Sequence, residues 1–121
     1  MPAALSGNTR SGGGSIGVLL TVLGATFVLN GLVAPTVEEM YFRGHILPRM
    51  PVIGWMAAVT NAALFSIQHF WQPDLYLLVF VLQLVSITVL MKLRDLRLPI
   101  ILHCLVNITG SVIALVAIMG R

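Results

Sequence analysis

The chain has 121 residues, of which 58% are hydrophobic and only 9% are charged. Because about a quarter of the residues in soluble domains are charged, this composition excludes an ordinary soluble domain and indicates a membrane protein. The net charge of +3 comes from scattered basic residues that are not interleaved with aromatic ones, which argues against a nucleic-acid partner.

The chain begins with a polar segment and continues with apolar runs. Residues 1–15 are rich in Gly and Ser, a composition that predicts a flexible leader. Residues 16–34 are apolar and match the length of about 20 residues that a transmembrane helix needs. Further apolar runs follow at 52–71, 75–91 and 99–119. We therefore expect an all-α, multi-pass transmembrane bundle of about four spans within a membrane-embedded domain at 16–121, with the first span kinked at Pro35.

Lysine and arginine concentrate in two of the connections between these runs. The connections 43–51 and 92–98 hold five of them, whereas the other side of the bundle has only Arg10 and Arg121. Basic residues favour the cytoplasmic side of a membrane. We therefore expect an integral protein of a bacterial cytoplasmic membrane, with these two connections in the cytoplasm and both termini outside.

Two adjacent carboxylates lie beside the first apolar run. An ionisable side chain inside a bilayer costs roughly 2.5 to 3.5 kcal/mol, so such groups call for partners or a function. Glu39 and Arg43 are four residues apart on one helix face, the favoured spacing for an ion pair. Glu38 points away from Arg43 and is free to act as a proton acceptor. The alternative is that both carboxylates simply lie at the water-exposed end of a helix.

Two more polar pairs lie on other spans. Phe65 precedes His69 by four residues, which lets the aromatic ring pack against the imidazole. His103 precedes Asn107 by four residues, which places an amide donor beside the second imidazole. One carboxylate, two imidazoles and one amide suffice to activate water and bind an oxyanion, although each residue alone is more often a packing residue. The run at 75–91 is expected to be scaffold, and its polar residues are Gln83, Ser86 and Thr88.

Together these pairs resemble the motifs of the CPBP family of CAAX proteases and bacteriocin-processing enzymes, also called the Abi or Rce1-like family. That family has the ordered patterns EExxxR, FxxxH and HxxxN. They occur here as Glu38-Glu39-Met-Tyr-Phe-Arg43, Phe65-Ser-Ile-Gln-His69 and His103-Cys-Leu-Val-Asn107. The resemblance covers about residues 34–120 and implies an intramembrane endopeptidase, with prenylated CAAX proteins as the eukaryotic substrates.

The resemblance also implies a role for each motif residue. Glu38 would be the general base that activates water, and His69 would help to hold the water or the carboxylate. His103 and Asn107 would stabilise the tetrahedral oxyanion. Residues expected to support the site structurally are Glu39, Arg43 and Phe65.

We expect first a glutamate-type mechanism that uses no metal cofactor. The alternative is a zinc ion bound by His69, His103 and Glu38, because two histidines and a carboxylate match the ligand types of catalytic zinc. If Glu38 bound zinc, however, another base would be required. A cysteine nucleophile is disfavoured because Cys104 is the sequence neighbour of His103, and neighbours on a helix do not face each other.

Two non-enzymatic functions remain open from the sequence. One is a non-catalytic binding protein, such as a bacteriocin self-immunity factor that captures a peptide. The other is a membrane scaffold in which the polar groups only join helices. The expected partners are the lipid bilayer and a membrane-associated or prenylated protein or peptide. Members of the family usually have further spans before the first motif. The chain is therefore expected to be a minimal member, a fragment, or a subunit whose missing helices come from a homo-oligomer or another partner.

The depths of the candidate residues pose a geometric problem. In straight spans, Glu38, His69 and His103 would lie about 15, 27 and 7 Å from the cytoplasmic connections at 1.5 Å per residue. A common site therefore requires tilted helices, or a connection at 92–98 that is sunk into the protein.

Overall fold

The computed structural model describes residues 11–121, and every regular element in that range is helical, as expected for an all-α protein. The first rod of helix starts with α1 (Ser11–Val28) and contains α2 (Ala34–Glu39). The remaining turns of this rod are π-helical at Leu29–Val33 and Met40–Ile46 and 3-10 helical at Leu47–Arg49. Residues 1–10 of the predicted leader lie outside the described residues, whereas residues 11–15 belong to α1.

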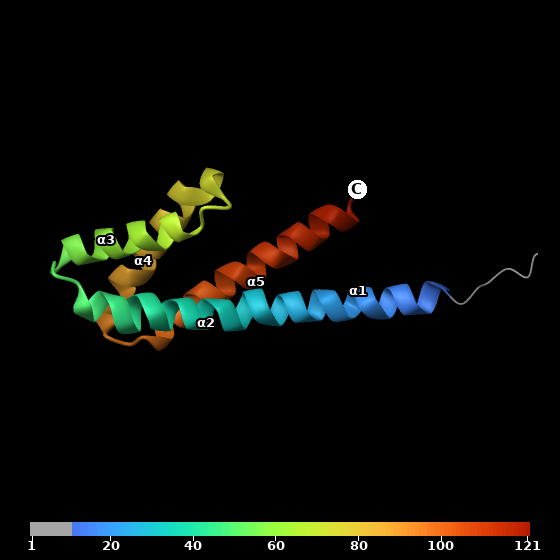
Figure 1. Cartoon of the computed structure of the whole chain (residues 1–121), viewed down its shortest axis with the longest axis horizontal. Coiled ribbons are helices and arrows are strands. Elements are labelled where there is room, and N and C mark those ends of the chain that lie inside the picture. The colour runs from blue at the N-terminus through green and yellow to red at the C-terminus, as the bar shows by residue number, and fades with distance from the viewer. Residues whose placement is uncertain (1–10) are drawn as a thin grey trace, which may run out of the picture.

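Three more helices complete the bundle. They are α3 (Trp55–Gln68), α4 (Tyr76–Leu93) and α5 (Arg97–Met119), with a 3-10 turn at Pro73–Leu75 before α4. Helix α3 packs along α4, and α5 contacts both α2 and α4. Figure 1 shows that α1 and α5 diverge towards their free ends, so the closest packing is near α2.

Three stretches of helix in the described chain are long and apolar enough to cross a bilayer, at Gly14–Arg49, Pro73–Leu93 and Arg97–Met119. The run expected as another span, 52–71, holds only the 14 residues of α3. At 1.5 Å per residue this helix is about 21 Å long, shorter than the ~30 Å hydrocarbon core. Helix α3 does not begin earlier because Gly54, the residue directly before it, adopts a φ of 65°. Glycine tolerates this conformation, but it is not helical.

The irregularity expected at Pro35 is a change of helix type. The π-helical turn directly before it is closed by a hydrogen bond from the Ala34 N–H to the Leu29 carbonyl. Proline has no N–H to continue this pattern. In the view of Figure 1, α1 and α2 lie along one line.

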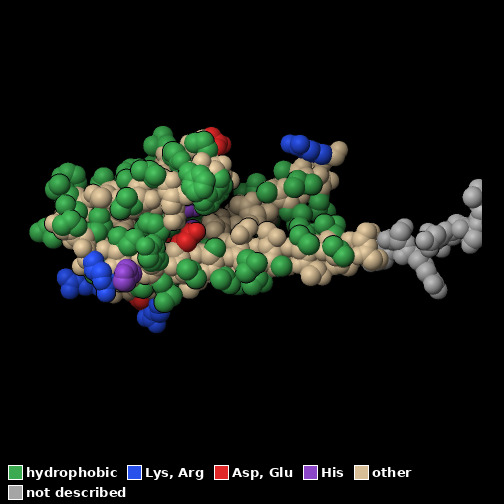
Figure 2. All heavy atoms as spheres, in the orientation of Figure 1, with side chains coloured by type: hydrophobic (Ala, Val, Ile, Leu, Met, Phe, Trp, Pro, Cys, Tyr) green, Lys and Arg blue, Asp and Glu red, His purple; other side chains and the backbone are tan. Residues whose placement is uncertain are grey.

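The two basic connections lie at the same end of the bundle. Figure 1 places the chain after α2 beside the chain between α4 and α5, and Figure 2 shows lysine and arginine side chains gathered over that end. A Cβ added to Gly44 would lie 3.4 Å from Leu96 Cδ2, so the two connections are in contact. Their common position agrees with one membrane face for both, and the cytoplasmic side remains a prediction.

Candidate active site

The contact between Gly44 and Leu96 solves the depth problem for two of the motifs. It places the connection between α4 and α5 beside the π-helical segment Met40–Ile46 and not beyond Arg49. Measured from this contact, Glu38 and His103 lie about 9 and about 10 Å along their helices. The connection between α4 and α5 thus lies within the length of the bundle, so the Glu38 carboxylate and the His103 imidazole lie at the same depth.

Helix α3 brings the third motif to the same level. Asn61 is fully buried and its amide nitrogen donates to the carbonyl oxygen of Phe42 at 2.9 Å. The Phe65 ring packs on the Phe42 ring, with 5.0 Å between their centroids. His69 follows Phe65 by one helical turn, at the end of α3. The short α3 is therefore fixed against the first rod and presents His69 towards Glu38.

Glu39 is the buried centre of the polar network. Its carboxylate is completely buried and lies 3.3 Å from Nε of Arg43, the ion pair expected from their spacing. The other carboxylate oxygen is 2.9 Å from Nδ1 of His103. Arg43 stacks over the Phe65 ring, with Cζ 4.8 Å from the ring centroid, and donates a hydrogen bond to Oε1 of Gln83. Through these contacts, Glu39 connects the first rod to α5 and Arg43 connects it to α4.

Glu38 has a different environment from its neighbour. Its side chain is 27% exposed, and one carboxylate oxygen lies 3.7 Å from Nε2 of His103. His103 therefore stands between two carboxylates. Since a carboxylate accepts hydrogen bonds, Glu39 is the acceptor for the Nδ1–H of His103, which leaves Nε2 facing Glu38. The sequence did not predict that Glu39 would orient this imidazole.

His69 is oriented by its own helix. Its Nδ1 lies 3.0 Å from the carbonyl oxygen of Phe65, which can only accept, so Nδ1 carries the hydrogen and Nε2 is an acceptor. The Phe65 ring packs at 5.1 Å from the imidazole, as predicted from the spacing of the motif. Trp71 packs on the imidazole at 5.1 Å as well, a contact that the sequence did not predict.

Asn107 has a partner other than the expected one. Its amide nitrogen donates to the carbonyl oxygen of Asn30 at 2.8 Å, across to the first rod, and no hydrogen bond to His103 is present in the described chain. In a π-helical pattern the nitrogen of Pro35 would serve this carbonyl, but proline has no hydrogen to donate. Asn107 therefore serves a backbone carbonyl that Pro35 cannot reach with a hydrogen, and its second amide hydrogen has no acceptor among residues 11–121.

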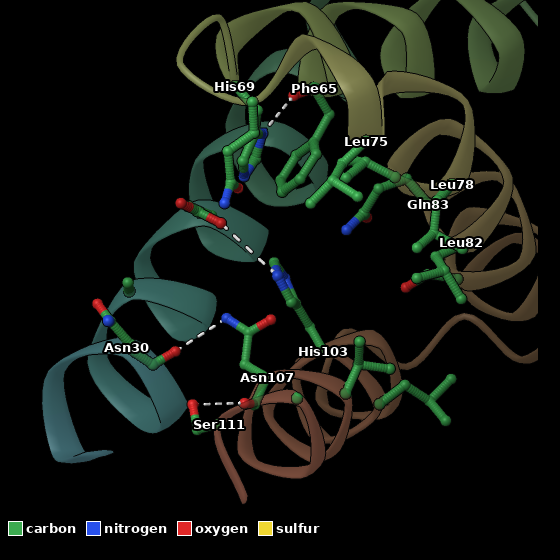
Figure 3. A pocket seen from close by; sticks show the side chains of 18 of the residues that line it. Asn30, Phe65, His69, Leu75, Leu78, Leu82, Gln83, His103, Asn107 and Ser111 are labelled. Atoms are coloured by element: carbon green, nitrogen blue, oxygen red, sulfur yellow. Dashed lines mark hydrogen bonds and ion pairs between the residues drawn. The ribbon is translucent and has the colours of Figure 1, made fainter. Parts of the chain in front are cut away.

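The four predicted residues line one cavity of about 680 Å³ between the helices: Glu38, His69, His103 and Asn107. Figure 3 shows His69, His103 and Asn107 around this space, with Gln83, Leu78 and Leu82 on the opposite wall. The first rod, the end of α3 and α5 contribute these four residues, whereas the wall formed by α4 is mainly apolar and also holds Gln83 and Ser86. Such an arrangement can hold a polar reacting group beside an apolar chain.

The ligands of the zinc alternative are His69, His103 and Glu38. No group of three or more His, Cys, Asp or Glu residues in the described part of the chain is placed to hold a metal ion. Both ring nitrogens of His103 face carboxylates, and Nδ1 of His69 is bonded to a carbonyl. The metal-free mechanism and the zinc alternative both stay predictions.

The comparisons with known proteins give one match. A family model described as "Type II CAAX prenyl endopeptidase Rce1-like" matches residues 19–109, which include all three motifs. Searches of curated proteins and of solved structures find no match.

Proposed function

Because this chain belongs to the Rce1-like family of type II CAAX prenyl endopeptidases, we propose that it is an integral-membrane endopeptidase in which Glu38 activates the attacking water. The observation that carries this proposal is the convergence of Glu38, His69 and His103 from three separate helices on one cavity. Charged and ionisable groups inside a membrane bundle usually mark a function.

The contacts support a distinct role for each acidic and basic group. Glu38 removes a proton from water as the oxygen attacks the substrate carbonyl carbon, and the proton then passes to the nitrogen that leaves when the C–N bond breaks. Nε2 of His69 accepts a hydrogen bond from the second O–H of the water and so holds the water in place. Glu39 fixes the ring of His103 by the 2.9 Å contact, so that Nε2 shares protons with Glu38.

The developing negative charge on the substrate oxygen needs donors in the same cavity. We assign this role to His103, when its Nε2 is protonated, and to the free amide hydrogen of Asn107. The contact of Asn107 with Asn30 fixes the direction of the amide and leaves this hydrogen available.

The substrate is proposed to be a membrane-associated or prenylated protein. Prenylated CAAX proteins are the substrates of the family, and the apolar wall formed by Leu75, Leu78 and Leu82 fits an apolar chain near the scissile bond. The contiguous position of polar groups and apolar wall allows the peptide bond and its lipid to bind together.

A direct cleavage assay tests this function. The purified protein is placed in phosphatidylcholine vesicles with a farnesylated peptide, and the products are identified by mass spectrometry. We expect a new C-terminal fragment that empty vesicles do not produce. A peptide that binds the protein but stays intact would contradict the enzymatic role and would favour the peptide-binding role of a self-immunity protein.

A further inference from the structure

Helix α4 carries polar groups on the face that lines the cavity. Gln83 and Ser86 are three residues apart, lie on one side of the helix and are 6% and 5% exposed. Thr88 differs from them, because its hydroxyl donates to the Leu84 carbonyl of its own helix at 2.7 Å. The Gln83 amide and the Ser86 hydroxyl therefore do not bond to the backbone of their own helix.

The contact with Arg43 fixes the direction of the Gln83 amide. A guanidinium group only donates, so the amide atom that faces it is the oxygen, Oε1. The amide nitrogen must then point the other way, and Figure 3 shows the Gln83 side chain directed into the cavity. Among residues 11–121, the only hydrogen bond of the Gln83 side chain is the one with Arg43. The Ser86 hydroxyl is buried without a partner in the same range.

A peptide bound in this cavity would require hydrogen-bonding groups of the kind that Gln83 and Ser86 provide. Its scissile bond becomes accessible only when the backbone is extended, and lipid offers no hydrogen bonds to an extended backbone. Each carbonyl oxygen that leaves water therefore requires a donor from the protein. The wall formed by α5 offers His103 and Asn107, and the opposite wall offers Gln83 and Ser86.

We propose that Gln83 is a substrate-binding residue, whose amide N–H donates to a backbone carbonyl oxygen of an extended peptide lying between α4 and α5. The hydroxyl of Ser86 binds a second backbone group of the same peptide. Arg43 acts as the positioning residue that keeps the Gln83 nitrogen directed at the peptide. This inference rests on the proposed function only in taking a peptide as the ligand.

The rival explanation is that Gln83 serves Arg43 alone, and two substitutions separate the roles. Gln83→Glu keeps an oxygen for Arg43 but removes the amide donor. Gln83→Met removes both. If Gln83 only positions Arg43, Gln83→Glu binds the peptide as tightly as the parent does, and Gln83→Met binds it more weakly. If Gln83 binds the substrate, both lose affinity.

The experiment measures binding of a fluorescent farnesylated peptide to the protein in phosphatidylcholine vesicles. All variants are made on a Glu38→Gln background, so that no cleavage interferes. We expect Gln83→Glu to weaken binding about 10- to 100-fold, the usual effect of losing one buried hydrogen bond. Gln68→Glu is the matched control at the end of α3, outside the cavity lining, and should bind like the parent.

Binding by Gln83→Glu as tight as that of the parent would overturn the inference. Should this variant fail to fold, Ser86→Ala decides, because it removes a hydroxyl that has no partner in the described chain and leaves the fold intact. We expect a several-fold weaker affinity with an unchanged melting temperature, and an unchanged affinity would overturn the inference. A wild-type protein that binds the peptide and never cleaves it would contradict the proposed function alone.

Discussion

Glu38 and Glu39 are neighbours in the sequence, yet the same substitution should affect them in opposite ways. Glu39 is fully buried between Arg43 and His103, and Arg43 is itself only 2% exposed. Glu39→Gln would remove the negative charge beside the buried arginine and leave it with the Gln83 amide and the Phe65 ring. Removing one partner of a buried ion pair costs about 3–5 kcal/mol. The Glu38 side chain is 27% exposed and lies 3.7 Å from the His103 imidazole. It should therefore contribute less than about 1 kcal/mol to the free energy of unfolding.

Thermal unfolding of the purified variants in detergent measures this difference. At roughly 4 °C per kcal/mol, Glu39→Gln should lower the melting temperature by about 12 °C or more. Glu38→Gln should melt within about 4 °C of the wild type. Equal shifts for the two variants, or a Glu39→Gln protein as stable as the wild type, would refute the division into a structural and a reactive carboxylate.

Three other predictions concern helix packing and the metal question. A Cβ on Gly31 would meet Ile108 Cγ1 at 2.9 Å, so Gly31→Ala should destabilise the protein by about 1–3 kcal/mol in the same melt, whereas Gly24→Ala, with open space around it, should not. Asn107→Leu leaves the Asn30 carbonyl without its donor and should cost about 1 kcal/mol, and a melt identical to wild type would contradict the bridging role. A zinc chelator should leave the cleavage rate unchanged, and loss of activity that added zinc restores would favour the metal alternative.

Features that depend on spacing within one helix could be predicted from the sequence. The pair of Glu39 and Arg43 and the packing of Phe65 on His69 both follow from residues four apart on one face. The all-α class followed from the long apolar runs. Local geometry of this kind is fixed by the helical repeat and needs no knowledge of neighbouring helices.

Features that depend on the register between helices could not be predicted. The partners of His103 and Asn107 are Glu39 and the Asn30 carbonyl, and both lie on the first rod. This register is set by close contacts such as that of Gly44 with Leu96, which no spacing in the sequence reveals. Gln83 was assigned to scaffold for the same reason, because its contact with Arg43 joins residues far apart in the chain.

The rate at which Glu38 variants cleave a farnesylated peptide in vesicles tests the central proposal most directly. Glu38→Asp keeps a carboxylate one methylene further from the water and should retain a reduced rate of cleavage. Glu38→Gln has the same shape as the wild type without the base, and it should give no product while its melting temperature stays near that of the wild type. Cleavage by Glu38→Gln at the wild-type rate would show that another group activates the water.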